Sequence, residues 1–398
     1  MCAGRAAGGA GLAPHRVEIR VMANDPVDRL LRRSLRGFTP YVPGTTEAEV
    51  RRRYGIASPV KLSQNENPLG TSPRALAALR AIDALSDYFE DDHGALRERL
   101  AATYGLAAGN VVLGHGSNEL VQHAFLAFVD HGDEVVMAQP SFSLFKKLAD
   151  LAGARSLRVP LRDGVHDLDA MLAAVTPATK LVFVCDPNNP TGTRVEPEAL
   201  HAFARALRPD VLLVIDQAYR EFMDAGGCDG VDVLRVRPMT LVLRTASKIH
   251  GLAAVRFGYG YSDPRIVRAI DAVRVPFNVA RPAAAAVLAA FDDHDFQRRS
   301  VANNESGKAY LYGEFARLGL EAYPTAANFI AVEVPCEAEA AYAALLERGV
   351  IVRSGAGLGM PRRLRVSIGT PEQNAAFIAA LEALLPAWRA AEAVGAVG

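Results

Sequence analysis

The stretch TASKIHGLAAVRFGYG, residues 245–260, places Lys248 among small and hydroxyl-bearing neighbours, with Arg256 further along. A lysine amine forms a Schiff base only when part of it is unprotonated, and nearby positive charge lowers its pKa. The stretch therefore suits a group that bonds covalently to an amine while an anion is held beside it. A surface lysine with a buried stem is the commoner explanation of any single lysine. Whether Lys248 has a catalytic role therefore depends on the other motifs of the chain.

Composition sets broad limits on the function. The 398 residues favour two domains, and 44 basic residues balance 44 acidic ones. A net charge of zero gives no reason to expect nucleic acid or an anionic membrane as a partner. No apolar run is long enough to span a bilayer. The four cysteines have no disulfide-like or metal-like spacing, which fits a reducing cytoplasm and predicts no metal site; they are Cys2, Cys185, Cys228 and Cys336.

The N-terminal residues 1–22 contain small residues and arginine but lack the apolar core of a secretory signal. We expect them to form a disordered lead-in, and Met22 could be the true start instead of Met1.

A repeated alternation of strands and helices begins near residue 110. Apolar strand-like runs are separated by helix-length amphipathic segments, which indicates a mostly parallel sheet covered on both faces. In such sheets the ligand site lies beyond the carboxyl ends of the strands. The predicted strands lie at 110–117, 134–140, 180–187, 211–219, 240–247 and 255–262.

The pattern changes after a long helical region, 264–317. Three strand candidates, at 327–334, 349–354 and 363–370, surround helices near 337–348 and 371–391, as in a separate small α+β domain. We expect four parts: a lead-in with a short helix at 1–37, a segment joining the small domain at 38–64, a large domain at 65–290 and a small domain at 291–398.

Three motifs at predicted strand ends carry related chemistry. In GHGSNEL (114–120), glycines and a helix N-terminus can bind a phosphate, although a bare N-cap is the alternative. In DPNNPTGT (186–193), Asn189 can donate a hydrogen bond to a ring oxygen, although a simple turn is the alternative. Asp216 follows a wholly apolar strand and should have a partner. That partner could be a protonated ring nitrogen, with Tyr219 on the ring hydroxyl, or an ordinary salt bridge or N-cap.

Arg353 and Arg365 lie in the small-domain strands GVIVRS and LRVSIGT. Two arginines on short strands can hold an anionic substrate with paired hydrogen bonds, whereas solvated strand arginines are the alternative.

Nine motifs together resemble, in their order, those of the class I/II pyridoxal-phosphate aminotransferases of fold type I. The closest likeness is to the histidinol-phosphate aminotransferase subfamily, and it extends from about Phe38 to Arg389. The resemblance implies a large α/β domain with a mostly parallel seven-stranded sheet covered by helices, plus a small α+β domain. The motifs are KLSQNENPLG, GHGSNEL, DPNNPTGT, VIDQAYREF, SKIHGLAAVRFGYG, RVPFNV, ANFI, VIVR and LRVSIGTPEQN.

The resemblance also implies roles for the matching residues. Lys248 would form the Schiff base with pyridoxal 5'-phosphate and then move a proton, and Asp216 would pair with the pyridine nitrogen. Asn189 and Tyr219 would contact the ring oxygen, and Phe142 stands where the family usually stacks a tyrosine on the ring. The phosphate would be surrounded by Gly116, Ser117, Asn118, Thr245, Ser247 and Arg256. The anionic end of the substrate would be held by Tyr41, Asn65, Asn328, Arg353 and Arg365.

Tyr88, in DYFED, matches a tyrosine that reaches the cofactor phosphate of the neighbouring subunit, which implies a homodimer. Four positions depart from the family's usual pattern and bear on the substrate more than on the chemistry. They are Gln217 for a glutamate, Ala246 for a bulkier residue, Phe142 for a tyrosine and Asp87 for an arginine.

The expected activity is ping-pong transfer of an amino group from histidinol phosphate, or a similar amine, to 2-oxoglutarate. Three alternatives remain. The donor could be an aromatic amino acid or a compound of specialised metabolism, or the enzyme could be a decarboxylase of the O-phosphothreonine type. A transcription regulator with this fold would need a DNA-binding domain, for which the residues before Phe38 are too few.

Overall fold

The computed structural model describes residues 26–35, 38, 44–88 and 93–395. The chain divides into two compact units, Met1–Thr45 and Thr46–Gly398. The described helices of the first unit are α1 (Pro26–Leu30) and the 3-10 helix η1 (Arg33–Leu35). All further elements belong to the second unit.

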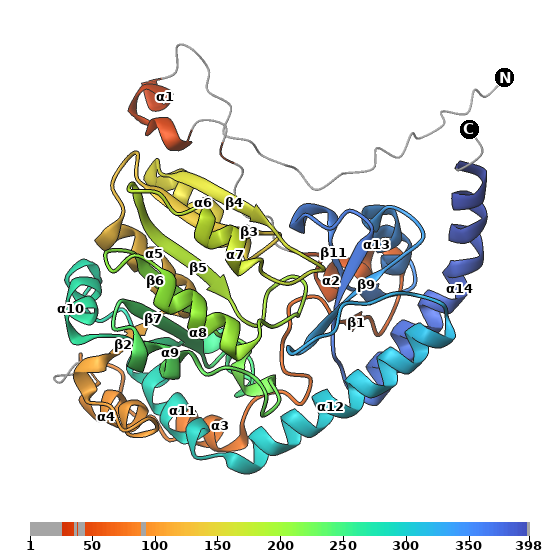
Figure 1. Ribbon diagram of the computed structural model, residues 1–398. Coiled ribbons are helices and arrows are strands. Elements are labelled where there is room, and N and C mark those ends of the chain that lie inside the picture. Colours follow the sequence, from red (N-terminus) through yellow and green to blue (C-terminus); the bar gives the residue numbers. More distant parts are fainter. Residues whose placement is uncertain (1–25, 36–37, 39–43, 89–92, 396–398) are drawn as a thin grey trace. The chain divides into compact units, whose positions relative to one another are not determined.

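The second unit contains a seven-stranded sheet in the order β2-β8-β7-β6-β5-β3-β4 (Figure 1). Strand β8 pairs antiparallel with both of its neighbours, and the other neighbouring pairs are parallel. The prediction of a mostly parallel seven-stranded sheet is therefore confirmed. The strands are β2 (Val111–Gly114), β3 (Glu134–Gln139), β4 (Arg155–Pro160), β5 (Thr179–Cys185), β6 (Leu212–Asp216), β7 (Thr240–Thr245) and β8 (Gly258–Tyr261).

Strand β4 is the one strand of this sheet that the residue pattern missed. It lies at the edge and pairs only with β3 in the described sheet, so most of its side chains stay partly or fully exposed. Its sequence RSLRVP therefore lacks the continuous apolar run that marks the buried strands.

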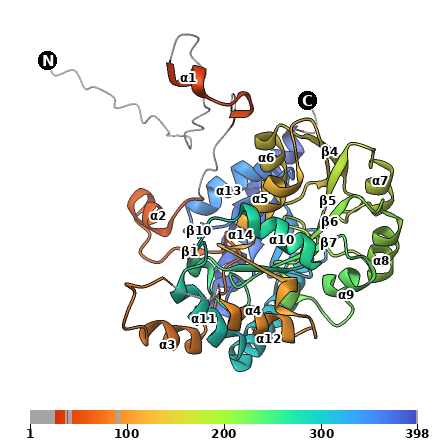
Figure 2. The same cartoon turned by 90° about the vertical axis from the view of Figure 1, so that its left-hand side faces the viewer.

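Helices cover both faces of the sheet (Figure 2). Apolar clusters pack α5, α6 and α10 against one face and α7, α8 and α9 against the other. A third cluster packs α3, α4 and α11 against β2, β7 and β8. The bounds are α3 (Pro73–Arg80), α4 (Gly94–Ala102), α5 (Ser117–Phe128), α6 (Ser143–Ala152), α7 (Leu168–Ala173), α8 (Pro197–Ala206), α9 (Gly230–Val236), α10 (Pro264–Val273) and α11 (Arg281–Phe291).

Two smaller sheets accompany the large one, and β1 precedes all of its strands in the chain. One has the order β11-β12-β9, and the other pairs β1 with β10. The long helix α12 extends from the region of α11 toward α14 (Figure 1). The elements are β1 (Val60–Lys61), β9 (Phe329–Glu333), β10 (Val350–Ile351), β11 (Arg353–Ser354), β12 (Arg363–Ser367), α2 (Glu47–Tyr54), α12 (His294–Arg317), α13 (Ala338–Leu346) and α14 (Pro371–Gly395).

The segment 349–354 was predicted as one strand, and this was wrong. Val350–Ile351 pairs parallel with β1, whereas Arg353–Ser354 pairs antiparallel with β12. The chain changes partner at Val352, so a single apolar run serves two sheets. The four-part domain division stays a prediction.

The large sheet brings the predicted motifs to one edge. Strands β2, β3, β5, β6 and β7 run in the same direction, so their carboxyl ends meet there. The segments that follow them begin the site described next. Among the described residues, no helix has both the length and the apolar character needed to cross a membrane.

Candidate active site

A cup of backbone and hydroxyl groups forms where β2, β7 and β8 meet α5. Gly116 is the N-cap of α5 and provides no side-chain cap, which leaves the first backbone N–H groups of the helix available to an anion. Thr245 donates a hydrogen bond to the Ser247 hydroxyl at 2.9 Å. The guanidinium of Arg256 contacts the same hydroxyl at 3.5 Å.

Two glycines make this close approach possible. A Cβ at Gly116 would lie 2.4 Å from Nη2 of Arg256, and a Cβ at Gly258 would lie 2.1 Å from the backbone nitrogen of Ser117. Gly116 also has a φ of +80°, which side chains rarely adopt. The structure thus brings together five of the six predicted phosphate-binding residues, and Asn118 follows them, exposed, in the first turn of α5.

Lys248 lies on the turn after β7, and its Nζ donates to the carbonyl of Gln64 at 3.1 Å. Nζ also lies 5.7 Å from the centre of the Tyr219 ring. Burial, reinforced by the positive charges of Arg365 and Arg256, lowers the pKa of Lys248 to about 8. A useful fraction of this amine is therefore unprotonated at neutral pH, as a nucleophile or base requires.

Asp216 ends β6 with 3% of its surface exposed. Its carboxylate accepts a hydrogen bond from the backbone nitrogen of Ala218 at 3.2 Å. Within the part of the chain that the structure describes, no basic side chain forms an ion pair with it. Burial raises the pKa of Asp216 to about 6. A cationic or protonated partner would therefore stabilise the charged form of this carboxylate.

Tyr219 connects three segments that are distant in sequence. Its hydroxyl accepts from Nδ2 of Asn65 at 2.9 Å and from Nδ2 of Asn189 at 3.5 Å. Asn328 donates to the carbonyl of Asn65 at 3.0 Å, and its own amide oxygen has no donor among the described residues.

Arg365 extends this group to the small sheet. Its guanidinium donates to Oδ1 of Asn189 at 2.8 Å and to the carbonyl of Ser63 at 2.7 Å. Arg353 lies directly opposite Arg365 across the antiparallel pair of β11 and β12. Side chains opposite each other in such a pair share one face of the sheet. The two predicted arginines are therefore neighbours.

Three further predicted residues either form no hydrogen bond or ring contact with the described residues of this group or lie outside the described residues, and their roles stay predictions. Phe142 follows β3 and packs edge-on against Phe145, with ring centres 5.5 Å apart. Tyr88 is 76% exposed and stacks on Phe277, and its predicted contact lies in the neighbouring subunit rather than in its own chain. Tyr41 lies outside the described residues.

Sequence reasoning missed two serines that support the site. Ser367 donates to the amide oxygen of Asn65 at 3.1 Å and accepts from its backbone nitrogen at 2.8 Å. Ser63 contributes only its backbone carbonyl. Both lie inside motifs that were quoted, LRVSIGT and KLSQNEN, but small polar residues there gave no separate signal.

Gln217 supports the backbone beyond the site. Its amide nitrogen donates to the carbonyl of Cys228 at 2.8 Å, and its amide oxygen accepts from the nitrogen of Gly230 at 2.9 Å. A glutamate could not donate the first of these bonds in its ionised form. The glutamine therefore fits this turn.

Comparison with known proteins decides the family. The family model "Aminotransferase class I and II" matches residues 57–381. The chain belongs to this family. It is an aminotransferase, and the cofactor of the family is pyridoxal phosphate.

The alignments with individual relatives cover most of this chain and most of each relative. The histidinol-phosphate aminotransferase of Moorella thermoacetica is 43% identical over 89% of this chain and 92% of its own. Histidinol-phosphate aminotransferase 2 of Ralstonia nicotianae is 44% identical over 88% and 96%. A crystal structure of the Sinorhizobium meliloti histidinol-phosphate aminotransferase with pyridoxal-5'-phosphate has a TM-score of 0.80 at 28% identity, covering 86% of this chain and 95% of its own.

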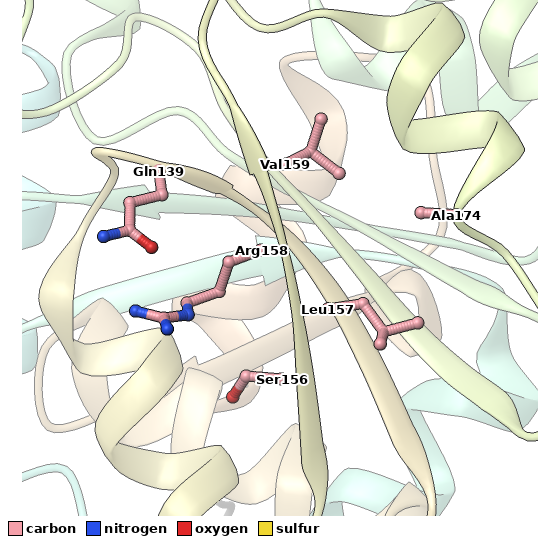
Figure 3. A pocket seen from close by; sticks show the side chains of 6 residues that line it. All are labelled: Gln139, Ser156, Leu157, Arg158, Val159 and Ala174. Carbon is pink, nitrogen blue, oxygen red and sulfur yellow. The ribbon is translucent and has the colours of Figure 1, made fainter.

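The residues of this aminotransferase fit the cofactor. The cup formed by Gly116, Gly258 and Arg256 suits a phosphate. The buried Asp216 carboxylate suits a protonated pyridine nitrogen. By contrast, the cavity of about 460 Å³ on edge strand β4 contains none of the predicted site residues (Figure 3). It is lined by Gln139, Ser156, Leu157, Arg158, Val159 and Ala174.

The lowered pKa of Lys248 gives the first prediction. In cofactor-free protein, the rate at which the amine captures pyridoxal phosphate should rise with pH around a midpoint near 8, well below the value of about 10.4 for a free lysine. The sign follows because only the unprotonated amine reacts. Stopped-flow growth of the visible absorbance band measures this rate.

Because the charge of Arg365 lowers this pKa, Arg365→Gln should move the midpoint to higher pH. Arg348→Gln, which changes an exposed arginine, is the control and should leave it in place. A midpoint near 10 in the unchanged protein would contradict the environment described for Lys248.

Proposed function

We propose that this aminotransferase takes an amino group from histidinol phosphate, or a similar phosphorylated amine, and gives it to 2-oxoglutarate. The observation that carries the proposal is the cross-strand pair of Arg353 and Arg365. Three relatives named as histidinol-phosphate aminotransferases, at 41–44% identity, support the same donor.

Two like charges directly opposite each other in a sheet are destabilising. Arg353 forms no ion pair with any described residue, and its partner across the strands, Arg365, carries a second guanidinium group. An anion between the two guanidinium groups would relieve their repulsion, and the planar fork of arginine matches both phosphate and carboxylate oxygens. One arginine pair can therefore hold the donor's phosphate and then the acceptor's carboxylate, without a second pocket.

The proposed roles follow from the positions of the side chains. When bound, pyridoxal phosphate supplies an electron sink for the substrate's Cα. Lys248 would accept and return the proton at that carbon, since its pKa lies near the working pH. Asp216 would keep a proton on the pyridine nitrogen. Asn189 and Tyr219 would orient the ring, and the cup around Ser117 and Arg256 would hold the phosphate.

We also propose that two chains form a homodimer in which Tyr88 reaches the partner's cofactor phosphate. Tyr88 and Phe277 stack at the surface, with ring centres 4.4 Å apart. Leu85 and Val275, close to them in sequence, are 70% and 66% exposed. An exposed, stacked aromatic pair of this kind is typical of a protein interface. The buried free cysteines Cys185 and Cys228 fit a reducing compartment, and we propose the cytoplasm.

Donor preference tests the proposed substrate. The enzyme with 2-oxoglutarate should have a higher kcat/KM for histidinol phosphate than for histidinol, phenylalanine or tyrosine, because only the first presents a phosphate to the arginine pair. Coupled detection of glutamate measures each rate. Preference for an aromatic amino acid would overturn the proposed donor while leaving the aminotransferase activity in place.

Arg353→Gln should reduce kcat/KM for histidinol phosphate by about tenfold to a hundredfold, the value of one charge-assisted hydrogen-bond pair. The value for unphosphorylated histidinol should change little in the same variant. Arg348→Gln is the matched control. Equal losses for the two donors would show that Arg353 does not bind the phosphate.

Mixing two inactive or weakened chains tests the shared site. Lys248→Ala removes the amine from one chain, and Tyr88→Ala removes the tyrosine from the other. Each mixed dimer would then hold one complete site, so refolding an equal mixture should restore about a quarter of the normal activity. Activity no greater than the sum of the separate variants would contradict a site completed by Tyr88 of the partner.

A further inference from the structure

Glu119 lies in the first turn of α5, two residues after Ser117, and is not among the residues assigned to the site. One oxygen of its carboxylate, Oε2, accepts two hydrogen bonds. The backbone nitrogen of His115 donates at 2.7 Å, and Nδ2 of Asn278 donates at 2.6 Å. The side chain thus connects the start of the phosphate cup with the segment 274–279.

The His115 bond acts on the cup itself. His115 immediately precedes Gly116, the N-cap of α5, which has no side chain to cap the helix. A glutamate at the third helical position often accepts from the N-cap backbone instead. Here the bond reaches one residue further back, so Glu119 sets the path of the loop that leads into Gly116 and Ser117.

The hydrogen bond between Asn278 and Glu119 attaches the surface segment 274–279 to α5. The amide oxygen of Asn278 accepts from Nη1 of Arg274 at 2.9 Å, and Nε of Arg274 pairs with Asp271 at 3.1 Å. Both ends of the Asn278 amide are therefore engaged, one by α5 and the other by the end of α10.

Phe277, next to Asn278, has a φ of +61°. This left-handed conformation is strained for an aromatic residue and persists where the surroundings enforce it. Its ring is 47% exposed and stacks on Tyr88. Phe277 directly precedes Asn278, whose amide is hydrogen-bonded at both ends, so the Asn278 bonds hold the chain next to the Tyr88–Phe277 stack.

We propose that Glu119 is a positioning residue that links the phosphate cup to the Tyr88–Phe277 surface, so that cofactor binding and chain pairing strengthen each other. The link acts through His115 on one side and Asn278 on the other. Coupling of this kind is reciprocal: if pairing tightens cofactor binding, the cofactor tightens pairing by the same factor. The inference rests on the proposed function for its cofactor site and its dimer.

A double-mutant cycle on cofactor release tests the link. Glu119→Ala and Asn278→Ala should each speed the release of pyridoxal phosphate from the holoenzyme about tenfold, as expected for loss of a hydrogen bond to a charged group. Multiplying the two single-variant increases gives the rate expected for independent changes. The double variant should release the cofactor far more slowly than that, because both changes remove the same bond. Release is followed by the loss of visible absorbance with an excess of a carbonyl-trapping amine.

Two further variants separate positioning from general damage. Glu119→Gln keeps an oxygen that can accept both bonds and should restore release to within about threefold of normal. Glu198→Ala removes an exposed glutamate from the first turn of α8 and should have no effect. Multiplicative effects in the double variant, or a glutamine variant as impaired as the alanine variant, would overturn the proposal.

Chain pairing supplies the second readout. Analytical ultracentrifugation should show that cofactor lowers the dimer dissociation constant of the unchanged protein, and that Glu119→Ala reduces this effect about tenfold or abolishes it. An undiminished effect in the variant would contradict the link. If the unchanged protein is monomeric throughout, the proposed dimer fails instead, and the release cycle still tests the bond within one chain.

Discussion

The Asp216 carboxylate ends strand β6 almost completely buried, with a backbone N–H from Ala218 as its hydrogen-bond donor. Its pKa rises from 3.8 to about 6 because burial disfavours the charged form. An acid whose pKa is higher in the folded protein than in the unfolded chain makes the fold less stable as pH rises between these two values. At neutral pH the ionised group therefore costs about 3 kcal/mol.

A positively charged partner beside the Asp216 carboxylate would offset this cost. A protonated pyridine nitrogen would compensate the buried charge, which is the role that we propose for Asp216. The parallel strands place Lys248, Asn189 and the phosphate cup at the same sheet edge. The small sheet contributes Arg365, which contacts Asn189 and Ser63. The site therefore depends on contacts between segments separated by most of the chain.

Much of this arrangement could be predicted from sequence because the signals are local. Continuous apolar runs marked the buried strands of the large sheet. Turn-forming residues at a strand end marked the position of Asn189, and small and hydroxyl-bearing neighbours marked Lys248. The order of the motifs indicated the family, which the comparisons confirm. The roles of the individual site residues stay predictions.

The rest required three-dimensional information. Edge strand β4 has no apolar run, and the change of partner at Val352 depends on which strands lie beside it. Ser367 and Glu119 act through hydrogen bonds to Asn65 and Asn278, whose distance in sequence gives no hint of contact. The use of Gln217 to hold the turn at Cys228 is likewise visible only in the fold.

The most direct test of this account measures one substitution in two ways. Asp216→Asn keeps the size of the side chain but removes its buried charge. The account predicts that the cofactor-free variant has a higher free energy of unfolding at neutral pH, measured by urea titration, and that it binds pyridoxal phosphate at least about tenfold more weakly. A less stable variant that keeps full cofactor affinity would contradict the claim that the buried carboxylate is stabilised by the cofactor.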